Sequence, residues 1–293
     1  MTFKDNSSWV ILNSIEQHIK QKIELNGKPL RELGVSINYG IKTGCNEAFI
    51  IDTEKKDELI SQDPKSAEII RPILRGKDIK RYHYDYADLY LIIAKYGSYR
   101  YLEKDYPAVY KHLQQYKTAL ENRGQCRYTS SRKIKTGSDY IGQHHWLELD
   151  NNPSDTYLDD FSKQKIAWGN LCLEPKFTIV EENMFVSAPS PVIVPGTKVL
   201  LAILNSKIAN WYIKNLGVTR NGGYFEYKPM FVEKLPIPEI PQKTKKILDD
   251  LINDIQAKAK SDSNYETLQN EVDKIICRCY NLTDKEIEFI ESV

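Results

Sequence analysis

The spacing of apolar residues predicts a helix at the start of the chain and short strands after it. Apolar positions recur at helical intervals between Leu12 and Ile23, and Asn26-Gly27 ends the pattern. The alternating run 35–39 predicts a strand, residues 40–46 a glycine-bounded loop, and residues 48–51 a second strand. We therefore expect a hairpin-like unit in this region.

The middle of the chain mixes short helices and strands in its hydrophobic pattern. Helices are predicted at 54–61, after Asp63-Pro64, at 107–122 and from Lys198 to about Asn215. Strands are predicted at 88–93, 165–168, 177–180, 185–186 and 192–194. Strands and helices that do not alternate regularly favour the α+β class over a doubly wound fold.

Beyond Pro241 the pattern is helical throughout. Apolar residues at helical spacing run from Ile247 to Ala259 and from Leu268 to Cys279, and Thr283-Asp284-Lys285-Glu286 is a capping box. We predict an α+β fold with a mixed or antiparallel sheet and flanking helices, followed by a small C-terminal helical hairpin or bundle. The expected divisions are a connector helix (1–30), a main domain (31–240) and a helical scaffold (241–293).

Composition is that of an ordinary globular protein, but charge is distributed unevenly. The 293 residues are 41% hydrophobic and 28% charged, with a formal net charge of +1. Residues 247–293 hold 11 acidic and 5 basic side chains, a net charge of −6, which leaves +7 on residues 1–246. A basic body with an acidic C-terminal part directs attention to the basic segments.

The cysteines and the apolar runs bear on the cellular compartment. The five cysteines are Cys45, Cys126, Cys172, Cys277 and Cys279, and none forms a pair with a two-residue gap. We expect no metal site, and we expect reduced thiols in a cytoplasmic protein. No signal segment opens the chain and no apolar run approaches membrane length, so we expect no membrane partner.

The segment 71–82 has the strongest concentration of positive charge near anchoring apolar residues. Five cations accompany a single acid, Asp78, and Gly76 marks a turn. We expect an anchored loop that binds phosphate through Arg75, Lys77, Lys80 and Arg81. A solvated basic face would have the same composition.

A second basic segment, 123–138, contains no acid at all. Its cations are Arg123, Arg127, Arg132, Lys133 and Lys135, interleaved with hydroxyl side chains and Tyr128. Such a run can lie along a phosphate backbone, and uncompensated cations beside a folded body favour a polyanionic partner. We expect these five cations to contact phosphates and Tyr128 to stack on or contact bases.

Two glycine-containing loops have side chains suited to base edges. Lys42, Thr43 and Asn46 lie in the first loop, which lacks the glycine spacing and the Gly-Lys-Ser/Thr ending of a nucleotide-binding loop. Arg220, Asn221 and Tyr224 flank Gly222-Gly223 in the second. Solvated turns are the alternative for both loops.

His144 and His145 are the only adjacent histidines in the chain, and Trp146 follows them. They lack the spacing of a helical metal-binding pair, and no nucleophile motif accompanies them. We expect a strand edge with Trp146 packed and both histidines partly exposed, where they could stack on bases or contact phosphate. A rival hypothesis is a metal-dependent hydrolase or nuclease that uses His144, His145 and Glu148.

Three stretches in a fixed order resemble a known family. They are residues 40–49, residues 71–82, and residues 200–207 followed by Leu235-Pro236-Ile237-Pro238. Together they resemble the TaqI-like C-terminal specificity domain of Eco57I-type adenine methyltransferases and type IIG restriction-modification enzymes. The closing region 282–288 is similar to the C-terminal end of those proteins.

This resemblance implies a target recognition domain that reads a short sequence in double-stranded DNA. It implies as partners an N-terminal methyltransferase domain and, in many members, a nuclease domain of the same enzyme. The family's Asn-Pro-Pro-Tyr motif is absent, and Asn151-Asn152-Pro153-Ser154 lacks its second proline and aromatic residue. We therefore expect no catalytic centre in this chain, with S-adenosylmethionine and Mg²⁺ used only by the other domains. A specificity subunit like those of type I restriction systems is the alternative.

Overall fold

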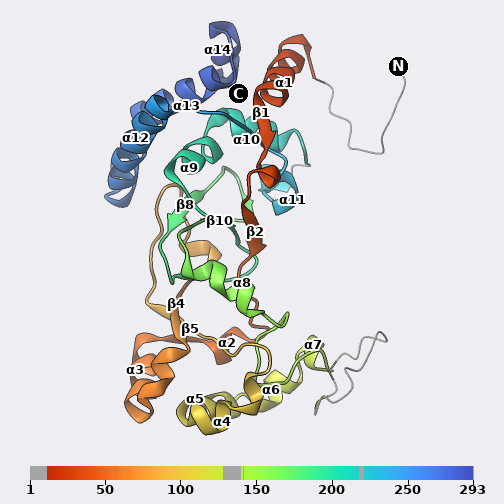
Figure 1. Ribbon diagram of the computed structural model, residues 1–293, viewed down its shortest axis with the longest axis vertical. Helices are drawn as coiled ribbons and strands as arrows, with labels where there is room; N and C mark the ends of the chain where they lie inside the picture. Colours follow the sequence, from red (N-terminus) through yellow and green to blue (C-terminus); the bar gives the residue numbers. More distant parts are fainter. Residues whose placement is uncertain (1–11, 128–139, 141, 218–220, 293) are drawn as a thin grey trace, which may run out of the picture.

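The molecule is elongated, with a sheet near its middle that separates two hydrophobic cores (Figure 1). The structure is a computed structural model and describes residues 12–127, 140, 142–217 and 221–292. We call the core at the top of Figure 1 the upper core and the one at the bottom the lower core. None of the described helices combines the length and the apolar character that crossing a membrane requires.

The central sheet is antiparallel and apolar on both faces. Its strand order is β2 (Ser36–Tyr39), β10 (Pro191–Val194), β6 (Lys165–Trp168) and β8 (Phe177–Val180). Ile166 and Trp168 belong to the upper core, whereas Ala167 between them belongs to the lower core. Successive side chains point to opposite faces of a strand, so a sheet between two cores requires continuous apolar runs.

The upper core is formed mainly by helices and includes both ends of the described chain. Its helices are α1 (Ser14–Asn26), α9 (Lys198–Leu204), α10 (Lys207–Lys214), α11 (Pro229–Val232), α12 (Gln242–Lys260), α13 (Glu266–Cys279) and α14 (Asp284–Ser292). Two short strand pairs accompany them, β1 (Gly27–Pro29) with β12 (Pro236–Pro238) and β7 (Leu171–Cys172) with β11 (Phe225–Glu226). The expected connector helix and C-terminal scaffold therefore share one core with the central sheet, and the divisions at 30 and 240 stay a prediction.

The lower core lies against the other face of the central sheet. It contains the mixed sheet β3 (Ile50–Asp52), β5 (Leu89–Ile92), β4 (Ile70–Leu74) and β9 (Phe185–Val186), in which only the β4–β9 pair is parallel. The helices on this side are α2 (Asn46–Phe49), α3 (Thr53–Gln62), α4 (Leu102–Asp105), α5 (Pro107–Gln114), α6 (Lys117–Glu121), α7 (Gly124–Arg127) and α8 (Asp155–Asp159). The predicted α+β class, with mixed and antiparallel sheets and a C-terminal helical region, is confirmed.

Several local predictions are wrong, among them the single helix at 107–122, which is the two helices α5 and α6. The expected hairpin at 35–51 does not form, because β2 pairs with β10 and β3 pairs with β5 in a different sheet. The expected helix at 198–215 is two helices, because the side chain of Ser206 accepts a hydrogen bond from Ala209 N and caps a new helix. The expected basic loop at 71–82 begins inside strand β4 and continues through the 3-10 turn Gly76–Asp78.

Candidate nucleic-acid interface

The loop 40–46 between β2 and α2 is fixed at its base by backbone contacts. Gly40 N donates to Ser190 O at 2.8 Å, and Ile41 N donates to Val186 O at 2.7 Å. A Cβ atom on Gly40 would lie 2.4 Å from Val186 O, so only glycine allows this approach. The loop is therefore rigidly attached to the strand β9 and to the turn after it.

Arg123 connects this loop to the segment 142–150. Its guanidinium donates to the carbonyl oxygens of Thr43 at 2.7 Å and of Trp146 and Glu148 at 2.8 Å each. Only 3% of the side chain is exposed. The prediction that Arg123 contacts a phosphate is therefore wrong, because protein carbonyls already occupy its donors.

His144 is buried as well and forms an ion pair with Asp150. His144 Nε2 lies 2.8 Å from Asp150 Oδ1, and Asp150 is also 3.7 Å from Arg123. Burial lowers the pKa of His144, but hydrogen bonds to Asp150, Cys126 and the His145 carbonyl outweigh it and raise it to about 9. The expectation of a partly exposed, base-stacking His144 is therefore wrong, since the buried ring contacts Asp150 and Cys126 inside the protein.

His145 and Glu148 also have structural contacts. His145 stacks on Tyr99 with ring centroids 4.6 Å apart, and burial raises the pKa of Glu148. Glu148 accepts hydrogen bonds from Gly97 N at 2.6 Å and from His145 N at 3.0 Å. Among the described residues no group of three or more His, Cys, Asp or Glu side chains could hold a metal ion. The arrangement gives no support to the metal-dependent hydrolase hypothesis.

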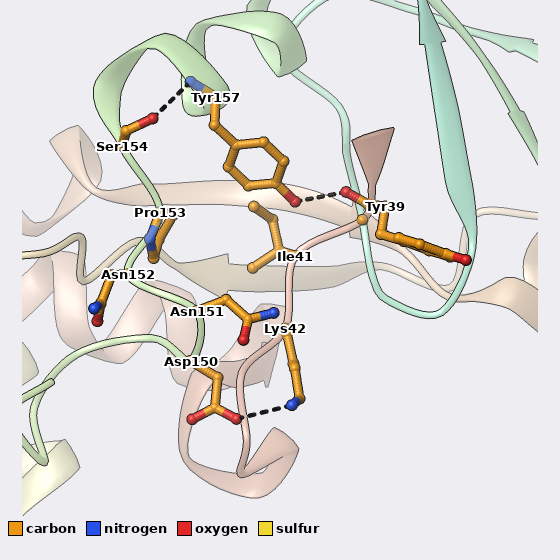
Figure 2. A pocket seen from close by; sticks show the side chains of 10 residues that line it. Tyr39, Ile41, Lys42, Asp150, Asn151, Asn152, Pro153, Ser154 and Tyr157 are labelled. Atoms are coloured by element: carbon orange, nitrogen blue, oxygen red, sulfur yellow. Dashed lines mark hydrogen bonds and ion pairs between the residues drawn. The ribbon is translucent and has the colours of Figure 1, made fainter. Parts of the chain in front are cut away.

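A pocket opens between the loop 40–46 and the segment 150–157 (Figure 2). Its volume is about 260 Å³, and Tyr157 Oη closes one end by donating to Tyr39 O at 2.6 Å. Lys42 reaches across the opening to Asp150, with 3.5 Å between Nζ and Oδ2, while about half of its side chain stays exposed. The pocket therefore presents one ammonium group beside amide side chains.

Two residues that line the pocket, Asn151 and Asn152, have an uncommon backbone conformation. Both have positive φ angles, 65° and 47°, which asparagine tolerates better than most residues. The side chain of Gln125 holds this turn, because its Oε1 accepts from Asn151 N at 2.9 Å and its Nε2 donates to Asn151 Oδ1 at 2.7 Å. Neither the place of this turn beside Lys42 nor the role of Asp150 was predicted from the sequence.

Three residues expected on the loop 40–46 do lie together. Thr43 is buried, and its hydroxyl donates to Asn46 Oδ1 at 2.6 Å, which removes Thr43 as a base-contacting side chain and corrects that prediction. Asn46 itself is exposed at the start of α2. Lys42 and Asn46 are therefore the two candidate base-contacting side chains of this loop that a ligand can reach.

The segment 71–82 displays less free charge than its sequence indicates. Arg75 forms a two-pronged ion pair with Asp78, with hydrogen bonds of 2.8 and 2.9 Å, and Lys80 lies 3.8 Å from Asp85. Arg81 donates to Asn205 O at 2.6 Å beside the upper core. These internal contacts occupy some donors of Arg75 and Arg81, and phosphate binding by these two residues stays a prediction.

Lys77 and Arg127 are exposed members of the two basic segments. Lys77 makes no ion pair with any described residue and follows β4, whose Leu74 O accepts from Ser187 N at 2.8 Å. Arg127 is exposed at the end of α7, one turn after the buried Arg123. The strand before Lys77 thus contacts the turn that holds the base of the loop 40–46, and Arg127 follows the arginine that donates to Thr43 O of that loop.

Some predicted contacts fall outside this group or outside the described residues. Tyr224 is 42% exposed but adjoins Phe225 of the upper core. Of Asn221, only the backbone is described, in the 3-10 turn Asn221–Gly223. The following predicted site residues lie outside the described residues: Tyr128, Arg132, Lys133, Lys135 and Arg220.

Comparison with known proteins places this fold in a family. A family model described as the TaqI-like C-terminal specificity domain matches residues 71–237, which is more than half of the chain. The protein belongs to this family, whose members are specificity domains of restriction-modification enzymes. The resemblance inferred from the ordered sequence motifs is thereby confirmed.

Individual proteins are similar to this chain in sequence or in fold. The type II methyltransferase M.MjaIV of Methanocaldococcus jannaschii is 24% identical over 253 residues, which cover 84% of this chain and 78% of that protein. The type IIL restriction-modification enzyme MmeI, solved in complex with DNA, matches 91% of this chain with a TM-score of 0.62 and 14% identity. The type IIG restriction endonuclease BpuSI matches 92% with a TM-score of 0.49 and 13% identity. The chain spans 37% and 33% of the lengths of these two solved chains.

Proposed function

We propose that this chain recognises a short sequence in double-stranded DNA for a restriction-modification enzyme. Family membership supports this function, and the convergence of two loops on one buried charged cluster supports the location of the reading surface. The guanidinium of Arg123 donates to carbonyl oxygens in both loops. The acceptors are Thr43 O in the loop 40–46, and Trp146 O and Glu148 O in the segment 142–150. A rigid support of this kind is what a base-reading surface needs, because a small displacement breaks a hydrogen bond to a base edge.

The exposed side chains around this cluster have the chemistry of a DNA contact. Lys42 can donate to guanine O6 and N7, and Asn46 can pair with the edge of adenine. Lys77, Lys80 and Arg127 would hold the phosphate backbone on either side, together with the basic residues that follow Arg127 in the sequence. His145, stacked on Tyr99, stays a candidate for base stacking, and the turn at Tyr224 would be a separate contact.

The chemical steps are assigned to other parts of the enzyme. We propose that an adenine methyltransferase domain, and in a type IIG arrangement an endonuclease domain, acts on the DNA that this chain positions. Those domains would bind S-adenosylmethionine and Mg²⁺, and the assembled enzyme would act in the cytoplasm.

Substitution of single cations tests the division between base reading and phosphate binding. Lys42→Met should relax the preference at one base pair and cost roughly 1–3 kcal/mol on the preferred duplex. Lys77→Met should weaken binding to all sequences alike and reduce the slope of log affinity against log salt by about 1. If neither variant changes duplex binding measured by fluorescence anisotropy, the proposed surface is wrong.

A stand-alone specificity subunit of a type I-like system is the second candidate function. It would place the catalytic domains on separate polypeptides. Co-purification of a methyltransferase polypeptide with the tagged chain from its native cells would favour this candidate. A single longer polypeptide that carries both activities would exclude it.

A further inference from the structure

The protonation of His144 follows from its two neighbours. Nε2 lies 2.8 Å from a carboxylate oxygen of Asp150, and Nδ1 lies 2.9 Å from the carbonyl oxygen of His145. Both neighbours accept hydrogen bonds and cannot donate them, so each ring nitrogen must carry a proton. His144 is therefore an imidazolium cation, in agreement with the raised pKa of this side chain.

The sulfur of Cys126 lies against this cation. Cys126 Sγ is 3.4 Å from His144 Nδ1 and 3.9 Å from Nε2, and the cysteine is partly exposed at the protein surface. Lys42 and Arg123 add positive charge around the single carboxylate of Asp150. A thiol beside a fixed cation in an electropositive surrounding is the environment that stabilises a thiolate.

The other cysteines have different surroundings. Cys45 is also partly exposed, but its sulfur lies 3.6 Å from the carboxylate of Glu47. Burial raises the pKa of Cys45, and Glu47 adds to that effect. Burial also raises the pKa of Cys172, Cys277 and Cys279. Cys45 and Cys126 thus form a matched pair within one chain, one beside an anion and the other beside a cation.

We propose that Cys126, whose sulfur lies against the His144 ring, is the cysteine of this chain that soft electrophiles and peroxides modify selectively. With hydrogen peroxide, the sulfur attacks one peroxide oxygen, an S–O bond forms and the O–O bond breaks. The departing hydroxide takes up a proton to become water. Sulfur is oxidised by two electrons to a sulfenic acid, and the peroxide is reduced.

The location gives this modification a consequence for the neighbouring loops. A Cβ atom on Gly142 would lie 2.2 Å from Cys126 O. The backbone at Gly142 therefore packs closely against the backbone at Cys126. Gln143 N also donates to Gln125 O at 2.8 Å beside this contact. An oxygen or alkyl group added to the sulfur would displace the His144–Asp150 pair, which supports Lys42. The predicted loss of DNA affinity after modification rests on the proposed function, whereas the reactivity itself does not.

The decisive experiment is iodoacetamide labelling of the intact folded chain, with peptide mass spectrometry to follow each cysteine. At pH 7 Cys126 should react at least about tenfold faster than Cys45. In urea the two rates should converge. Equal or slower labelling of Cys126 in the folded chain would overturn the proposal.

Variants test the partner and the consequence. His144→Gln should reduce the labelling rate of Cys126 to that of Cys45; an unchanged rate in a folded variant would remove His144 from the proposal. If this variant does not fold, the comparison of Cys126 with Cys45 in the unmodified chain, folded and in urea, still decides. Treatment with peroxide should then lower duplex binding in the parent chain but not in Cys126→Ser. A chain that never binds DNA refutes the proposed function while the labelling result stands.

Discussion

Arg123 and Arg127 lie one helical turn apart and show how environment separates two identical side chains. Arg123 is buried against three loop carbonyls, whereas Arg127 is exposed at the end of α7. Arg123→Met should destabilise the fold by about 3–5 kcal/mol, because it removes one cation from the buried Asp150 and leaves the three carbonyls without this donor. Arg127→Met should change stability by less than about 0.5 kcal/mol but weaken duplex binding. Urea unfolding and DNA titration of both variants check this; equal destabilisation would contradict it.

The pH dependence of stability should report the His144–Asp150 pair. The folded pKa of His144, about 9, exceeds its ordinary value of 6.5, so its contribution is complete below pH 6.5 and is lost as pH rises through 9. The pair lowers the pKa of Asp150, whose contribution is lost in strong acid instead. The free energy of unfolding should therefore fall on the order of 3 kcal/mol between pH 6.5 and about 10.

Two histidine variants separate this effect from general alkaline unfolding. His144→Gln should flatten the alkaline decline in melting temperature. His112→Gln should leave it in place, because burial lowers the pKa of His112 and its titration affects only the acidic side. An alkaline decline that persists in His144→Gln would show that the pair does not control it.

At the scale of single residues, the sequence predicted which segments carry charge but not which partner each charged side chain contacts. The basic segments were identified correctly as segments, yet the structure pairs Arg75 with Asp78 and buries Arg123. The partner of Arg123 and His144 is Asp150, an isolated acid whose role depends on contacts between distant segments. Periodicity cannot reveal such contacts, because they depend on tertiary packing.

At the scale of elements, the break between α9 and α10 is a structural joint. Asn205 is fully buried there, and its amide accepts from Phe177 N at 3.2 Å and donates to Phe177 O at 2.9 Å. Asn205→Ala should cost about 1–3 kcal/mol, because it leaves a buried backbone N–H of β8 without a partner. Asn215 ends α10 and is partly exposed, so Asn215→Ala is the control with little expected effect. Thermal unfolding of both variants decides.

The strands of the central sheet were predictable and their pairing was not. Continuous apolar runs at 165–168, 177–180 and 192–194 indicated buried strands, and all three form. The expected hairpin failed because β2 pairs across a long connection with β10 instead of with the next segment. Local patterns show which residues are buried, whereas distant contacts decide which strands pair.

At the scale of the whole molecule, the C-terminal helices are part of the fold. Leu248 and Ile252 of α12 and Ile276 of α13 are fully buried in the same core as Ile19 of α1. A chain that ends at Pro241 should therefore lose cooperative unfolding, because it exposes one side of that core. Ile252→Ala should cost about 2–5 kcal/mol, whereas Ile247→Ala, 41% exposed on the same helix, should cost far less. A truncated chain that still unfolds in one sharp transition would contradict this prediction.

We propose that the surface around Lys42 and Arg127 reads a short duplex sequence. The first test is binding of the full chain to a library of randomised duplexes across a salt series. We expect enrichment of one short sequence and a loss of affinity by orders of magnitude between about 50 and 200 mM salt. No enrichment at low salt, both for this chain and with a catalytic methyltransferase domain joined to it, would show that this surface does not read DNA sequence.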